Sequence, residues 1–207
     1  MYLNGLCFIT DRNLCHLTSE EMASIVLRSG VKWIQYREKN KSRREIYKEA
    51  VILRNLTAAF KASLIVNDHA DIAIAVDADG VHLGQEDLPI KEARKILGKK
   101  KIIGISTHNL EQAIEAEAGG ADYIGFGPVF HTKTKDAGDP KGIAMIKEIK
   151  KHLKIPIVAI GGINLENLKS VMDAGADAVA VASAILKGDI SENTKRFFEI
   201  LYKNSLL

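Results

Sequence analysis

The chain has 207 residues, of which 46% are hydrophobic and 27% are charged, and this composition excludes an intrinsically disordered protein. The formal net charge is only +3, and the lysine clusters at 99–101 and 147–154 have no interleaved aromatic residues, which argues against a nucleic-acid partner. No apolar run approaches the roughly 18 residues of a membrane span.

Cysteine content and linker composition limit the organisation of the chain. Cys7 and Cys15 are too few for a disulfide framework and lack metal-ligand spacing. We therefore expect a cytoplasmic protein with no membrane partner. Because no Pro-, Ser- or Gly-rich linker divides the sequence, we also expect a single domain over residues 1–207. The sequence leaves open whether the chain forms a homo-oligomer.

Short apolar runs alternate with longer amphipathic segments along the whole chain, which is typical of β/α units around a parallel sheet. The predicted strands are Leu6–Thr10, Trp33–Arg37, Leu64–Asn67, Val81–Leu83, Ile102–Ser106, Tyr123–Gly127, Ile157–Ile160 and Ala178–Ala182. The predicted helices are Ser19–Arg28, Ser42–Phe60, Asp71–Val76, Pro89–Leu97, Leu110–Ala118, Ile143–His152, Glu166–Asp173 and Glu192–Lys203. Eight such units predict an α/β fold, a single-domain (β/α)8 TIM barrel, with a doubly wound open sheet as the alternative.

In a (β/α)8 barrel the chemistry belongs at the carboxyl ends of the strands, and polar residues gather at these positions here. Gln35, Arg37 and Lys39 alternate along an extended segment, so their side chains point the same way and offer an amide and two cations to an anion. The alternative is that the two cations only balance Glu38 at the surface. Glu38, however, points to the opposite side of the strand.

Two aspartates end neighbouring strands and could share a hard cation. Asp68 follows the third predicted strand and Asp87 the fourth, and Mg²⁺ is commonly held by one or two carboxylates with substrate phosphates completing its shell. Beside Arg37 and Lys39, this pattern indicates a Mg²⁺-diphosphate site. The alternative for each aspartate is a helix N-cap.

A second anion site is predicted after the seventh and eighth strands. Gly161 and Gly162 follow one strand and Ser183 follows the next, where barrels commonly bind phosphate through backbone N–H groups. The long segment from Thr132 to Gly142 reads as a lid that brings Lys135 to the mouth of the barrel.

Several motifs, in order, resemble the thiamine-phosphate synthase family. They are Gln35-Tyr36-Arg37-Glu38-Lys39, Val66-Asn67-Asp68, the segment Gly80 to Asp87, the segment Gly125 to Lys135, Ile9-Thr10-Asp11-Arg12 and Ala159-Ile160-Gly161-Gly162-Ile163. The resemblance covers nearly the whole chain. It implies a TIM barrel that joins a hydroxymethylpyrimidine diphosphate to a thiazole phosphate, or its carboxylated form, and releases pyrophosphate with Mg²⁺ as cofactor.

The resemblance also implies roles for particular residues. Asp68 and Asp87 would bind Mg²⁺, and Arg37, Lys39 and Lys135 would act in catalysis by stabilising charge on the leaving pyrophosphate. The pyrimidine diphosphate would be bound by Gln35, Tyr36, Arg37, Glu38, Lys39, Asn67, Ser106 and Lys135. The thiazole phosphate would be bound by Thr132, Lys133, Thr134, Gly162, Ala182 and Ser183. His131 is a departure, because relatives usually carry proline there.

Three alternatives compete with this function. Thiazole tautomerase shares the scaffold, but the relative in question carries histidine where this chain has Pro128 and departs from the diphosphate motifs that are intact here. A non-catalytic protein that binds thiamine precursors would show no turnover. Sugar-phosphate epimerases share the Gly161-Gly162 end but give no reason for Gln35, Arg37 and Lys39.

Overall fold

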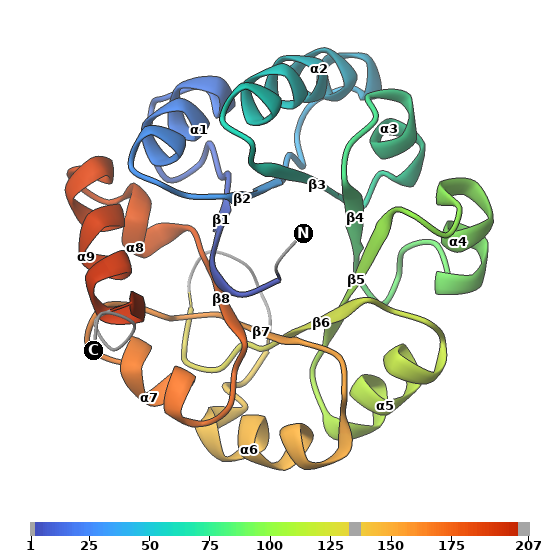
Figure 1. Ribbon diagram of the computed structural model, residues 1–207, viewed down its shortest axis with the longest axis vertical. Coiled ribbons are helices and arrows are strands. Elements are labelled where there is room, and N and C mark those ends of the chain that lie inside the picture. The colour runs from blue at the N-terminus through green and yellow to red at the C-terminus, as the bar shows by residue number, and fades with distance from the viewer. Residues whose placement is uncertain (1–2, 133–137, 203–207) are drawn as a thin grey trace.

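A computed structural model describes residues 3–132 and 138–202, and within these ranges the chain forms eight strands and nine helices (Figure 1). The strands are β1 (Gly5–Ile9), β2 (Trp33–Tyr36), β3 (Ser63–Asn67), β4 (Gly80–Leu83), β5 (Ile102–Thr107), β6 (Tyr123–Phe126), β7 (Ile157–Ile160) and β8 (Ala178–Val181). The helices are α1 (Ser19–Arg28), α2 (Arg43–Ala59), α3 (Ala70–Ala75), α4 (Ile90–Leu97), α5 (Leu110–Ala118), α6 (Gly142–His152), α7 (Leu168–Asp173), α8 (Ser183–Leu186) and α9 (Ile190–Tyr202).

The eight strands close into a parallel barrel in sequence order, with the helices forming an outer ring (Figure 1). The last strand pairs with the first in a register that runs from Gly5 opposite Ala178 to Phe8 opposite Val181. The predicted TIM barrel is therefore confirmed, and the alternative of an open doubly wound sheet is wrong.

Side chains alternate along each strand between the barrel interior and the layer under the helices, as the pleat requires. On β2, for example, Trp33 packs inside the barrel, whereas Ile34 and Tyr36 pack outward beneath the helices. This alternation decides which side chains of the strand ends reach the mouth.

Two helix starts are fixed by capping boxes that the sequence supplies. Thr18 and Glu21 exchange side-chain and backbone hydrogen bonds at the start of α1, and Ser42 and Glu45 do the same at α2. The second box sets where the loop after β2 ends. That loop carries the cationic residues of the predicted diphosphate site.

The structure differs from the sequence prediction mainly after β7 and β8. Helix α7 begins at Leu168 rather than Glu166, because the Asn164 side chain accepts backbone N–H bonds from Glu166 and Asn167 and holds them in a turn. Strand β8 ends at Val181, so Ser183 begins the short helix α8 instead of ending the strand. A four-residue helix is too short to show a periodicity in the sequence.

Candidate active site

A cavity opens at the carboxyl ends of the strands, where the fold is expected to place its chemistry. Its lining comes from the ends of β1, β2 and β5 to β8, and a neighbouring hollow is bordered by residues 11–13 and 37–41. Asp11 and Arg37 line both spaces. The predicted site residues that line the main cavity are Arg37, Ser106, Thr132, Gly162, Ala182 and Ser183.

Arg37 is held at this junction by the end of β1. Its backbone N–H donates to Thr10 Oγ1 at 3.0 Å, and its guanidinium Nη1 lies 3.2 Å from Asp11 Oδ2. Asp11 is only 3% exposed, and its other carboxylate oxygen accepts the backbone N–H of Asn13. The guanidinium is therefore aimed by a buried carboxylate. Sequence reasoning assigned no role to Asp11, although it noted the Thr10-Asp11 pair.

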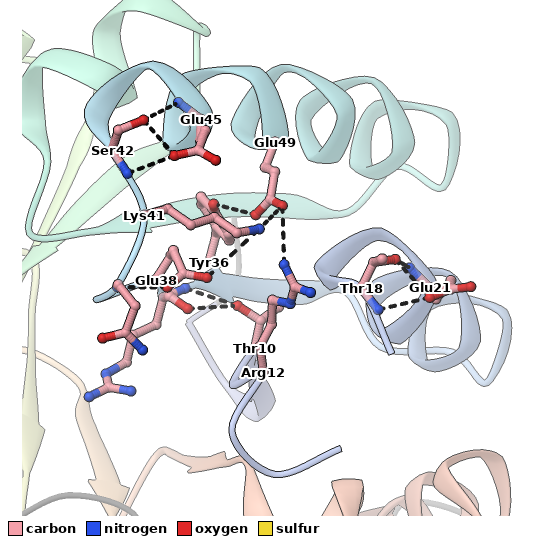
Figure 2. A network of polar contacts seen from close by, with 12 residues as sticks. Thr10, Arg12, Thr18, Glu21, Tyr36, Glu38, Lys41, Ser42, Glu45 and Glu49 are labelled. Atoms are coloured by element: carbon pink, nitrogen blue, oxygen red, sulfur yellow. Dashed lines mark hydrogen bonds and ion pairs between the residues drawn. The ribbon is translucent and has the colours of Figure 1, made fainter. Parts of the chain in front are cut away.

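Tyr36 and Glu38, which the sequence motif placed among the diphosphate ligands, have side chains committed elsewhere (Figure 2). The Tyr36 hydroxyl donates to Glu49 of α2 at 2.7 Å, and Lys41 contacts the same carboxylate. The Glu38 carboxylate is 7% exposed and accepts the backbone N–H of Asn40 at 2.8 Å. The alternation along β2 turns both side chains away from Arg37, so these side chains support the loop, and a role of the two residues in binding the diphosphate stays a prediction.

Lys39 and the two predicted metal ligands form one cluster beyond β2, β3 and β4. The ammonium group of Lys39 contacts the carboxylate of Asp68, and Asp68 and Asp87 are linked by a hydrogen bond. Burial raises the pKa of Asp68, but Lys39 and the bond from Asp87 outweigh it and leave the pKa below its usual value. Burial and the charge of Asp68 raise the pKa of Asp87.

The helix N-cap alternative for these aspartates is wrong. The residues at the N-caps of α3 and α4 are His69 and Pro89, and neither helix has a side-chain cap. Asp87 instead accepts the backbone N–H of Gly84 at 2.6 Å within its own loop, and Asp68 adopts a φ of 65°. A non-glycine residue in this region is uncommon and is often found at functional sites.

On the floor of the cavity, Ser106 at the end of β5 is joined to a buried histidine. The Ser106 Oγ lies 2.9 Å from His82 Nε2, and the His82 Nδ1 lies 2.9 Å from the Tyr123 hydroxyl. Sequence reasoning gave His82 no role and missed its link to Ser106, because the contact depends on the direction in which the two side chains point.

Gly161 and Gly162 form the opposite wall, and both have positive φ, 95° and 67°. A Cβ on Gly162 would lie 2.6 Å from the His131 carbonyl oxygen and 2.7 Å from Phe130 Cβ, so only glycine fits this close approach. The loop is further tied by the Asn167 side-chain amide, which donates to the Gly162 carbonyl at 3.0 Å. Thr132, Ala182 and Ser183 complete this wall.

The remaining predicted residues divide into two groups. Gln35 is 5% exposed near the end of β2, and Asn67 ends β3 at the same end of the barrel. Lys133, Thr134 and Lys135 lie outside the described residues, so their predicted roles stay predictions. Among the residues that the structure describes, no three or more His, Cys, Asp or Glu side chains form a group that could hold a metal ion.

The closed parallel barrel, with a polar cavity at the carboxyl ends of its strands, is the architecture of a TIM-barrel enzyme. Residues 6–185 match the family model described as thiamine monophosphate synthase. The chain belongs to this family.

Known members of the family are similar in sequence to this protein over nearly its whole length. Thiamine-phosphate synthase of Halalkalibacterium halodurans is 46% identical over 96% of this chain and 92% of its own, and that of Clostridium novyi is 50% identical over 89% and 91%. The solved thiamine phosphate pyrophosphorylase from Pyrococcus furiosus is 41% identical, covers 96% of each chain and superposes with a TM-score of 0.89. A 3-hexulose-6-phosphate synthase, 18% identical with a TM-score of 0.69, shares the fold alone. In the described part of the chain, no helix has the length and apolar character needed to cross a membrane.

Proposed function

We propose that the protein condenses 4-amino-2-methyl-5-hydroxymethylpyrimidine diphosphate with a thiazole phosphate to give thiamine phosphate and pyrophosphate. The observation that carries this proposal is that one cavity is lined by Arg37 and Ser106 on one side and by the Gly161-Gly162 loop and Ser183 on the other. A tautomerase acting on the thiazole phosphate alone would need the glycine wall but not the cluster of Arg37, Lys39, Asp68 and Asp87. Family membership supports the same activity.

The diphosphate is assigned to the wall formed by β2 to β5. Asp11 holds the Arg37 guanidinium where the cavity meets the neighbouring hollow, and Lys39, which borders that hollow, lies beside Asp68. Ser106 and Asn67 add polar groups at the neighbouring strand ends. Gln35 offers an amide to the pyrimidine, and Lys135 is assigned to the same ligand from the family motif alone.

Asp68 and Asp87 have the donor chemistry that Mg²⁺ requires. Their two carboxyl groups lie close enough to interact, and the pKa of Asp87 is raised first by burial and then by the charge of Asp68, a repulsion that a divalent cation would relieve. Two carboxylates leave most of an octahedral shell for water and diphosphate oxygens. When bound, Mg²⁺ would neutralise charge on the leaving pyrophosphate.

The residues of the chain then act mainly by charge and by alignment. As the bond between the pyrimidine methylene carbon and the diphosphate oxygen breaks, its electron pair leaves with pyrophosphate, and Arg37 and Lys39 stabilise the growing negative charge. The electron-rich aminopyrimidine carries the positive charge that remains. The lone pair of the thiazole nitrogen forms the new C–N bond, so no nucleophilic side chain is needed.

The thiazole phosphate is assigned to the wall formed by β7 and β8. Backbone N–H groups around Gly162 and the Ala182-Ser183 turn suit a phosphate monoester, and the Thr132 side chain lies on the same wall. Lys133 and Thr134 are assigned there from the family motif. Holding both substrates across one cavity aligns the attacking nitrogen with the methylene carbon and keeps water away from a reactive cation.

The test is incubation with both phosphorylated precursors and Mg²⁺, followed by chromatography for thiamine phosphate and an assay for pyrophosphate. We expect both products in equal amounts. Arg37→Ala should abolish most turnover, whereas Arg54→Ala, which removes an arginine paired with Asp79 outside the cavity, should retain it. Conversion of the thiazole phosphate without condensation would contradict the proposal.

A further inference from the structure

Two buried side chains and Ser106, which lines the cavity, form a network of hydrogen bonds. Tyr123 on β6 contacts His82 on β4, and His82 contacts Ser106 on β5, each at 2.9 Å. Tyr123 is 1% exposed and His82 is 8% exposed, so water has little access to these contacts. A polar network in this position needs an explanation, because barrel interiors are normally filled by apolar side chains.

Two glycines leave room in the barrel interior for this hydrogen-bond network. A Cβ on Gly104 would lie 2.0 Å from the Tyr123 ring, and a Cβ on Gly125 would lie 2.8 Å from His82 Cε1. The edge of the Tyr123 ring also packs against Trp33, with ring centroids 5.2 Å apart. The two polar rings are therefore fixed by the shape of the interior, and neither can swing away without disturbing a strand.

The partners of each group determine which atom donates and which accepts along this hydrogen-bond network. Tyr123 is fully buried, and burial raises its pKa well above the usual value, so the hydroxyl keeps its proton. That proton must be donated, because a buried hydroxyl rarely goes unsatisfied, and His82 Nδ1 lies within reach. An imidazole that accepts at Nδ1 carries its own proton at Nε2. The Nε2–H then donates to Ser106 Oγ.

We propose that Tyr123 and His82 form a positioning relay that fixes the His82 tautomer and thereby points the Ser106 hydroxyl proton into the cavity. With its oxygen already accepting from His82, Ser106 serves as a donor to an anion in the mouth. The assignment of that anion as the substrate diphosphate rests on the proposed function. The direction of the relay is a property of the protein without ligand.

The relay matters because a fixed donor stabilises charge without reorganising during the reaction. A free serine hydroxyl could instead donate to His82 and present only lone pairs to the diphosphate, which would repel it. Each bond in a chain of this kind also polarises the next.

The first experiment reads the tautomer directly, by ¹⁵N NMR of the histidine-labelled protein without substrates. We expect His82 to carry its proton on Nε2, with Nδ1 unprotonated. In Tyr123→Phe, which removes the proton donated to Nδ1, we expect the Nε2–H form to lose its dominance. A proton on Nδ1 in the wild type would overturn the relay, and so would an unchanged tautomer in Tyr123→Phe.

The second experiment asks whether His82 acts through Ser106. We expect Tyr123→Phe to lower kcat about tenfold with little change in KM, and His82→Gln, which keeps a donor near the Nε2 position, to retain more activity than His82→Ala. In a Ser106→Ala background, the loss caused by Tyr123→Phe should shrink to within about twofold. Equal losses in both backgrounds would overturn the positioning role.

A control separates this role from simple destabilisation. Thr194→Val removes a buried hydroxyl that donates to Ile190 within α9, away from the cavity, and should leave kcat unchanged at a similar unfolding midpoint. The NMR result stands even if the protein forms no thiamine phosphate. Failure of the proposed function and failure of the proposed relay would therefore give different results.

Discussion

Replacement of Gly162 by alanine tests the glycine wall most sharply, because the structure gives both costs of the change. Gly162 has a φ of 67°, which disfavours any residue with a Cβ by about 1–2 kcal/mol. The new Cβ would also lie 2.6 Å from the His131 carbonyl oxygen and 2.7 Å from Phe130 Cβ. Relief of such overpacking typically costs about 1–3 kcal/mol more.

Gly120→Ala is the matched control. Gly120 follows α5 with a φ of 92°, but its Cβ would meet nothing within 4 Å. The control therefore carries the backbone cost of about 1–2 kcal/mol without the steric cost. The difference between the two variants, about 1–3 kcal/mol, measures the displacement of the segment that leads into Thr132.

Because this segment and the Gly162 backbone form one wall of the cavity, we expect Gly162→Ala to weaken thiazole phosphate binding by about 10- to 100-fold. Pyrimidine diphosphate binding should change less than about threefold, since its wall is built from other strands. Isothermal titration calorimetry with each ligand and urea unfolding of both variants provide the measurements. Equal weakening of both ligands, or equal effects of Gly120→Ala, would refute the reasoning.

Three further predictions concern the opposite wall. Asp11→Asn removes the charge that aims Arg37 and should lower kcat/KM about tenfold or more, with wild-type turnover arguing against the role of this contact. Because Asp87 has a raised pKa and must ionise to bind a cation, the Mg²⁺ concentration needed for half-maximal activity should increase as pH falls, and this dependence should be lost together with the Mg²⁺ response in Asp87→Asn. Lys135→Ala should lower the single-turnover rate by about 10²- to 10³-fold, and a loss confined to substrate affinity would exclude a transition-state role.

The sequence predicted the architecture well because the barrel repeats one local pattern eight times. Continuous apolar runs identified every strand, and polar residues after them located the mouth. The close pairing of Asp68 with Asp87 also followed from their places after neighbouring strands. These features depend on residues near one another in sequence or on the fixed order of the strands.

Other features depend on which way a side chain turns in three dimensions. Tyr36 shares a motif with Arg37, yet the pleat of β2 sends its side chain to Glu49 on the outer face. The contacts of Asp11 with Arg37 and of His82 with Ser106 join neighbouring strands, but they depend on the direction in which each side chain points, which the sequence does not give. A sequence motif groups these residues, but it does not show which of their side chains face the cavity.

We expect one cavity to bind two phosphorylated groups on opposite walls. The most direct test is a crystal structure of the protein with thiamine phosphate, pyrophosphate and Mg²⁺. We predict pyrophosphate on Arg37, Lys39 and Ser106, Mg²⁺ on Asp68 and Asp87, and the phosphate of thiamine phosphate against Gly162 and Ser183. Pyrophosphate on the glycine wall, or a cation bound away from both aspartates, would contradict the account.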